Sequence, residues 1–189
     1  MDAIQMIKKR RSIRNFKDKV VDRKLMEEIV EIARFTPSWG NYQIARYTFV
    51  DNIDIIKRLA YEGVNDFIYN VGTLKNAKNV VILSFVKGKS GIIEKLPVED
   101  GEFNNNGTSS SWEVFDAGIA CQTFALAAHA KGIGSVIMGV INDKAISEIV
   151  ELPEDETVAA LLVYGYPEGE HPAATPRKET SEIMRFAGE

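Results

Sequence analysis

Three arginines and a serine lie within five residues near the N-terminus, in the segment Arg10-Arg11-Ser12-Ile13-Arg14. Guanidinium groups pair bidentately with phosphate, and the serine hydroxyl adds a further donor. The same charges also suit the C-terminal end of a helix expected over Asp2–Arg10, because cations stabilise that end. Arg14 lies beyond this helix and after Ser12, which favours a phosphate-binding segment.

A second segment, Gly132-Ile133-Gly134, matches the first three positions of a dinucleotide-binding fingerprint but does not lie between a strand and a helix. That fingerprint needs G-x-G-x-x-G after a strand and at the start of a helix. Here a helix is expected before the segment, a strand after it, and the next glycine is Gly139. The sequence therefore argues against a Rossmann site. We expect Gly132 to end the preceding helix, and Gly139 to let a flat ligand approach the backbone.

Other polar side chains allow both a functional and a structural interpretation. The Asn41 amide can donate and accept at the edge of a ring that carries N–H and C=O groups, or it can be a turn asparagine beside Gly40. Asp116 lies in an apolar helix and could be catalytic, although we favour a buried or interface carboxylate paired with a cation. Cys121 lies in the same helix and is expected to be a core thiol.

Acid–base and metal chemistry have little support in the sequence. His129 and His171 are the only histidines, and no Cys, His and carboxylate spacing matches a metal site. No Ser-His-Asp set or P-loop is apparent. If the chain is an enzyme, a cofactor is therefore expected to carry the chemistry.

Composition and net charge exclude several classes of protein. The chain has 189 residues, of which 45% are hydrophobic and 26% charged, which suits one domain over residues 1–189. A net charge of -4 argues against nucleic-acid binding through a basic surface. The apolar run 114–130 is too polar and too short for a membrane span, and the N-terminus is no signal peptide. The single cysteine suits a cytoplasmic location.

Helical periodicity and apolar runs predict alternating helices and strands, typical of an α+β or α/β sandwich. We expect helices over Asp2–Arg10, from Asp22 to just before Pro37, from Asp51 or Asn52 to Leu59, over Trp112–Lys131, and from Asn142 to Val150. We expect strands over Tyr47–Val50, Val80–Val86, Ser135–Val140 and Val158–Tyr164. Residues 37–43 are expected to form a loop, 87–111 a variable lid or substrate loop, and 167–189 a C-terminal tail.

Taken in order, several of these motifs resemble the nitroreductase family over nearly the full chain. The residues that carry the resemblance are R-R-S-I-R at 10–14, P-S-W-G-N-Y-Q at 37–43, the segment 116–135, Met138-Gly139, the segment 162–167 and Pro176-Arg177-Lys178. The sequence departs from the family pattern at Ile44, where many members have proline. It offers no motif to match over 87–111, the segment expected to shape the substrate pocket.

The resemblance implies an α+β sandwich with a central, mostly antiparallel sheet flanked by helices, and a homodimer with two FMN sites at its interface. It assigns the FMN phosphate to Arg10, Ser12, Arg14 and Arg177, and places Arg11 along the flavin. It assigns Pro37, Ser38, Trp39 and Asn41 of the other subunit to the same site. It places Asn70 at the pyrimidine edge and the backbone of Met138 and Gly139 at the flavin N5 and O4 region.

The function that the resemblance implies is a ping-pong oxidoreductase. NADH or NADPH would reduce the bound FMN, and an electron-poor small molecule such as a nitroaromatic or a quinone would reoxidise it. Alternatives within the fold are reductive dehalogenation and flavin cleavage. A non-catalytic flavin-binding or regulatory protein and a flavin-free anion-binding module are alternatives of other classes.

Overall fold

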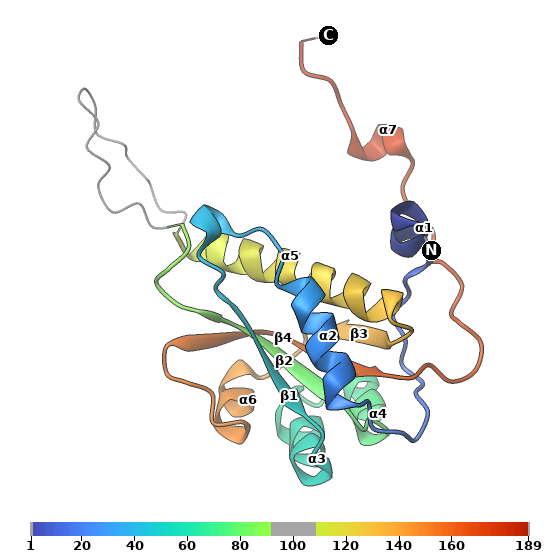
Figure 1. Cartoon of the computed structure of the whole chain (residues 1–189), viewed down its shortest axis with the longest axis vertical. Helices are drawn as coiled ribbons and strands as arrows, with labels where there is room; N and C mark the ends of the chain where they lie inside the picture. Colours follow the sequence, from blue (N-terminus) through green and yellow to red (C-terminus); the bar gives the residue numbers. More distant parts are fainter. Residues whose placement is uncertain (1, 92–108, 189) are drawn as a thin grey trace.

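The computed structural model describes residues 2–91 and 109–188, without the side chains of 109–111. One four-stranded sheet has helices on both faces (Figure 1). The helices are α1 (Ala3–Lys9), α2 (Arg23–Ala33), the 3-10 turn η1 (Trp39–Asn41), α3 (Ile53–Glu62), α4 (Ile68–Lys75), α5 (Ser109–Ala130), α6 (Asp143–Ile149) and α7 (Thr180–Ile183). The strands are β1 (Ala45–Val50), β2 (Val80–Val86), β3 (Gly134–Met138) and β4 (Glu156–Gly165). The predicted α+β class and antiparallel sheet are confirmed.

The sheet has the order β1-β2-β4-β3, and every neighbouring pair is antiparallel. The central strand β2 is buried from Val80 to Phe85. Its unbroken run of apolar residues is expected where helices cover both faces of a sheet. The strands β1 and β3 form the two edges of the sheet.

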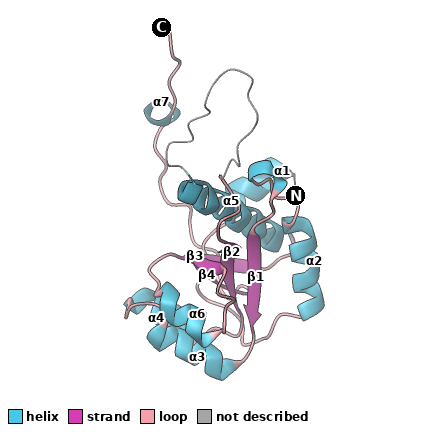
Figure 2. Cartoon of the chain, turned by 90° about the vertical axis from the view of Figure 1, so that its left-hand side faces the viewer, coloured by secondary structure: helices cyan, strands magenta, loops and turns pink. Residues whose placement is uncertain are grey.

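Two hydrophobic cores lie on opposite faces of this sheet, because side chains alternate along each strand. Leu83 and Leu162 face α2 and α5 and pack in one cluster with Phe124. Ile82 and Leu161 point to the other face, where α3, α4 and α6 complete the second cluster. Figure 2 shows the strands between these two helical layers.

Polar N-caps begin most of the helices that the sequence predicts. The side chains of Asp2, Asp22, Asn52 and Asn142 each accept a backbone N–H from the first turn of α1, α2, α3 and α6. Each bond satisfies an N–H group that has no partner within its helix. The cap of α3 is therefore Asn52 and not Asp51, the other candidate.

The structure also corrects several predicted boundaries. Strand β1 begins at Ala45, two residues before the predicted start, and β3 ends at Met138 and not at Val140. Helix α4 was not predicted, because Phe67 gives it no side-chain cap and its sequence has little amphipathic periodicity. Packing against α3 stabilises α4 instead.

Residues 168–188 form an arm that extends away from the body of the protein (Figure 1). Every residue of this arm is exposed, including the large apolar side chains of Ile183, Met184 and Phe186. The predicted tail contains the short helix α7, which a capping box between Glu179 and Glu182 begins.

Most of the segment predicted as a lid, 87–111, lies outside the described residues. Among the helices of the described ranges, none is long and apolar enough to cross a membrane.

Candidate functional site

The arginine-rich segment 10–14 is fixed to the beginning of β3. Ser12 forms a parallel bridge with Ser135, and the Ile13 N–H donates to the Ser135 carbonyl oxygen at 3.0 Å. The Ile13 side chain is buried against Gly134, where an added Cβ would lie 2.8 Å from Ile13 Cγ1. Glycine at 134 therefore lets the segment approach the strand and sets the position of the arginines on either side of Ile13.

A cavity of about 190 Å³ brings together the predicted phosphate-binding residues. Its polar lining includes Arg10, Arg11, Ser12, Arg14 and Arg177. Within the described part of the chain, none of these arginines forms an ion pair with a carboxylate. The cavity is therefore strongly positive and suited to a multiply charged anion such as a phosphate monoester.

Backbone carbonyl groups hold two of these arginines in place. Arg11 donates from Nη1 to the carbonyl oxygens of Lys8 at 2.6 Å and Arg10 at 2.8 Å. Arg177 donates from Nη1 to the Thr175 carbonyl oxygen at 2.9 Å and also to the Thr175 hydroxyl. The two guanidinium groups keep further N–H donors, because each has five.

His129, in the last turn of α5, adds a titratable group near this cluster that sequence reasoning missed. Burial lowers the pKa of His129, and the charges of Arg10, His171 and Arg11 lower it further. Its Nε2 is buried and has no hydrogen-bond partner among the described residues. No local sequence pattern indicated this, because His129 approaches Arg10 only through the tertiary contact between the segment 10–14 and β3.

The predicted ring-binding residues meet just beyond the other end of β3. The Asn70 side chain is buried and donates from Nδ2 to the Val140 carbonyl oxygen at 3.1 Å. Met138 is buried, whereas Gly139 is exposed and has no heavy atom within 4 Å of the position of a Cβ. No described heavy atom therefore covers the Cβ side of Gly139, and the approach of a flat ligand there stays a prediction.

The loop 37–43 has an unusual backbone. Gly40, Asn41 and Gln43 have φ values of 51°, 58° and 52°, in the left-handed region that few residues other than glycine adopt. The Ser38 hydroxyl accepts the Gln43 N–H at 2.9 Å, and the Trp39 N–H is bound by Asp116. The exposed Asn41 lies in the turn beside Gly40, and its role at the edge of a ring stays a prediction.

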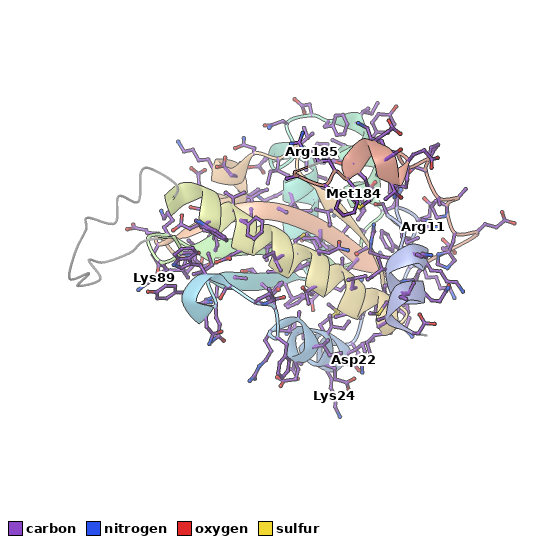
Figure 3. All side chains as sticks on the ribbon, turned by 90° about the horizontal axis from the view of Figure 1, so that it is seen from above. Arg11, Asp22, Lys24, Lys89, Met184 and Arg185 are labelled. Carbon is purple, nitrogen blue, oxygen red and sulfur yellow. The ribbon has the colours of Figure 1, made fainter. Side chains whose placement is uncertain are left out.

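Within one chain, the structure does not bring the loop 37–43 to the other predicted site residues. The loop contacts α5 at Asp116, whereas the arginine cavity lies beside His129 near the other end of that helix. The two helix positions are about 20 Å apart along the axis. Figure 3 shows Lys89 near the first end of α5 and Arg11 near the second.

Two residues of α5 test the structural interpretations of the sequence. Asp116 is buried as predicted, but the partners that the structure describes are the Trp39 N–H and the Ser90 hydroxyl, not a cation. Cys121 is 6% exposed, and burial raises the pKa of its thiol to about 11. A thiol with that pKa is a poor nucleophile at neutral pH, so Cys121 is a core residue, as predicted.

Comparison with known proteins places this architecture in a family. The family model for the nitroreductase family matches residues 7–166. A relative in Archaeoglobus fulgidus with a provisional NADH dehydrogenase/NAD(P)H nitroreductase name is 27% identical over 173 residues, covering 89% of this chain and 87% of its own. An FMN reductase [NAD(P)H] of Bacillus subtilis is 27% identical over 179 residues, covering 93% of this chain and 70% of its own.

Solved structures agree with the sequence comparison. An FMN-dependent nitroreductase of Clostridium difficile matches with a TM-score of 0.73 and 25% identity, over 98% of this chain and 99% of its own. A nitroreductase family protein of Streptococcus pneumoniae has the same fold, with a TM-score of 0.80 at 22% identity over 98% of this chain and 100% of its own. The chain belongs to the nitroreductase family. It is an oxidoreductase, as the sequence predicted.

Proposed function

We propose that this chain, as one domain over residues 1–189, binds FMN and transfers reducing equivalents from NADH or NADPH to an electron-poor small molecule. The observation that carries this proposal is the pair of features at the two ends of β3. An arginine cavity without described ion pairs lies beside Ser135, and the open backbone of Gly139 follows the strand. These positions are about 13 Å apart, a spacing that suits a ligand with a phosphate at one end and a flat ring at the other.

Arg10, Ser12, Arg14 and Arg177 would hold the FMN phosphate, and Arg11 would lie along the flavin. The donor chemistry of the cavity fits this group, because guanidinium and hydroxyl groups supply only donors to a phosphate dianion. The neutral form favoured at His129 adds no further charge to this cluster. The FMN phosphate would supply the negative charge that no carboxylate among the described residues supplies to these arginines.

Asn70, Met138 and Gly139 would contact the flavin ring. The hydrogen bond from Asn70 to Val140 fixes the amide beside the backbone that follows β3. Backbone and amide groups aimed at the ring would stabilise the electron-rich reduced form, since preorganised dipoles act where charge develops.

When bound, FMN would supply hydride acceptance from the nicotinamide at N5 and electron donation to an acceptor such as a nitroaromatic or a quinone, in a ping-pong cycle. The protein supplies position and electrostatics. Protons for the acceptor would come from water.

We further propose a homodimer in which two chains share each FMN site. The loop with Pro37, Ser38, Trp39 and Asn41 lies near the opposite end of α5 from the arginine cavity, and in this proposal it contacts the FMN that a second copy holds. The arm 168–188 supports the same arrangement. Its apolar side chains Ile183, Met184 and Phe186 are exposed on a single chain and would gain burial on a partner.

Comparison of FMN with riboflavin tests the cofactor assignment most sharply. Both ligands carry the same ring, and only FMN carries the phosphate. Titration of the apoprotein should give at least about 100-fold tighter binding of FMN, because charge-assisted hydrogen bonds contribute about 1.5–3 kcal/mol each. Equal affinities for the two ligands would contradict the phosphate site, and binding of neither would contradict a flavin function.

A further inference from the structure

Asp116 is a buried carboxylate that the proposed redox chemistry does not use. It lies on α5, is 2% exposed, and accepts the Trp39 N–H at 3.1 Å through Oδ1 and 3.0 Å through Oδ2. The Ser90 hydroxyl donates to Oδ2 at 2.6 Å. These hydrogen bonds connect three segments that are far apart in sequence. They leave the carboxylate without an exposed edge for a substrate.

Asp116 holds the start of the loop 38–43 to the body of the protein, whereas the buried Ile44, directly after the loop, holds its end. The loop's internal bonds, from Gln43 N–H to Ser38 Oγ and from Asn41 N–H to the Ser38 carbonyl oxygen, move with the loop. The contacts that tie the loop to α5 are the Asp116 bonds and the packing of Trp39 on Trp112, whose ring centroids are 4.8 Å apart.

The backbone of this loop needs such a support. Asn41 and Gln43 hold positive φ values, and a left-handed conformation is unfavourable for a residue other than glycine. A strained conformation persists only where its surroundings fix it. Asp116 fixes the start of the loop at Trp39, immediately before Gly40, where the left-handed residues begin.

We infer that Asp116 is a positioning residue for flavin binding: it sets the conformation of the loop 38–43 through the Trp39 N–H, and its loss weakens FMN binding without any contact with the cofactor. The inference rests on the proposed function, in which this loop contributes Ser38, Trp39 and Asn41 to an FMN site. A carboxylate suits the role, because both of its oxygens accept. An asparagine amide would turn an NH2 group toward the Trp39 N–H or the Ser90 hydroxyl.

The chain offers a direct optical report on this loop. Trp39 and Trp112 are its only tryptophans, so their coupling is free of other indole signals. Two indoles at this separation give an exciton couplet in the far-ultraviolet circular dichroism, and the couplet depends on their mutual orientation. The experiment records this couplet in apoprotein and the FMN dissociation constant in Asp116→Ala and Asp116→Asn.

Glu113→Gln is the matched control. Glu113 is also a buried carboxylate of α5, and it accepts the N–H groups of Gly88 at 2.6 Å and Lys89 at 3.3 Å. Loss of the Glu113 carboxylate should lower thermal stability, as loss of the Asp116 carboxylate should. The amplitude of the couplet and the FMN dissociation constant should both stay within twofold of their values in the unmodified protein. A merely structural carboxylate at 116 would behave like Glu113.

The expected result is a lost or reshaped couplet and roughly 10- to 100-fold weaker FMN binding in Asp116→Ala, with a smaller change in Asp116→Asn. If the alanine variant does not fold, the asparagine variant and its couplet decide alone. An unchanged couplet overturns the positioning role, and a changed couplet with unchanged FMN affinity overturns its link to the cofactor. If unmodified protein takes up no FMN, the proposed function fails, and the apoprotein couplet still decides whether Asp116 sets the loop.

Discussion

At the scale of single residues, the clustered arginines are the strongest indication of which ligand the protein binds. Four of them line one cavity, and the described residues provide no carboxylate to pair with them. Clustered guanidinium groups repel one another unless an anion joins them. We therefore propose that a bound anion, and not the stability of the apoprotein, accounts for this arrangement.

Replacement of a cavity arginine should release FMN. In Arg10→Ala or Arg177→Ala, one charge-assisted contact to the phosphate is lost, so the FMN dissociation constant should rise about 10- to 100-fold. Lys9→Ala is the control, because Lys9 belongs to the same basic run in the last turn of α1 but does not line the cavity. Fluorescence titration with FMN measures the dissociation constants of the three variants. Unchanged affinity in both arginine variants would exclude the phosphate assignment.

The thiol of Cys121 should be chemically inert in the native protein. Because burial raises its pKa to about 11, little thiolate exists at neutral pH, and alkylation by iodoacetamide should accelerate as the pH rises toward that value. Unfolding in urea should restore the reactivity of an ordinary thiol. Rapid alkylation of folded protein at pH 7 would contradict a core role and reopen the question of a nucleophile.

Residue types in the sequence were sufficient for the arginine cluster but not for the partners of buried groups. The predicted burial of Asp116 follows from its apolar helix, whereas its bonds to Trp39 and Ser90 depend on how distant loops return to α5. The same applies to His129, which no local pattern connects to Arg10. Tertiary contacts of this kind have no signature in the neighbouring sequence.

At the scale of elements, the edge strand β3 organises the site. Its first residues hold the arginine segment through Ser135, and the backbone that follows its last residue is open at Gly139. Gly132 ends α5 with a φ of 78°, so the chain turns directly from the helix into this strand, as predicted.

A side chain at position 134 should disturb both stability and the phosphate site. In Gly134→Ala, the new Cβ would lie 2.8 Å from Ile13 Cγ1 and 3.0 Å from Pro167 Cγ, and overpacking of this kind costs about 1–3 kcal/mol. Urea unfolding should show this loss, together with weaker FMN binding. Gly72→Ala is the control, because no atom lies near its Cβ position in α4 and alanine should stabilise that helix. Equal stability of the two variants would contradict the close approach at 134.

The sequence predicted best those elements whose local signals agree with their environment. The apolar run of β2 and the polar caps of α2 and α6 were sufficient to locate these elements within a few residues. Helix α4 was missed because its ends carry no such signal and its packing on α3 decides its conformation.

At the scale of the whole molecule, one chain has the loop 37–43 and the arginine cavity near opposite ends of α5. The fold and the family could be predicted from motif order alone, but this separation is visible only in the structure. It explains why the loop 37–43 and the arginine segment 10–14 are parts of one sequence signature without being neighbours in one chain. A second copy would bring the two together.

Removal of the arm should separate the dimer. A chain that ends at Glu179 loses α7 and the exposed Ile183, Met184 and Phe186 but little of the core, so the body should still fold. We expect the dimer dissociation constant from sedimentation to rise at least about tenfold, with a parallel loss of FMN affinity. A chain that ends at Phe186 is the control. An arm-less chain that remains an equally stable dimer with unchanged FMN would contradict the proposed role of the arm.

We propose that this chain uses bound FMN to oxidise a nicotinamide, and anaerobic visible spectroscopy tests this function most directly. Protein loaded with FMN is mixed with NADH and, separately, with NADPH, while dithionite shows that the bound flavin can be reduced. We predict a flavin spectrum that bleaches with at least one nicotinamide and recovers when a quinone or a nitroaromatic is added. A flavin that dithionite bleaches but neither nicotinamide reduces would contradict the account and indicate a flavin-binding protein without this activity.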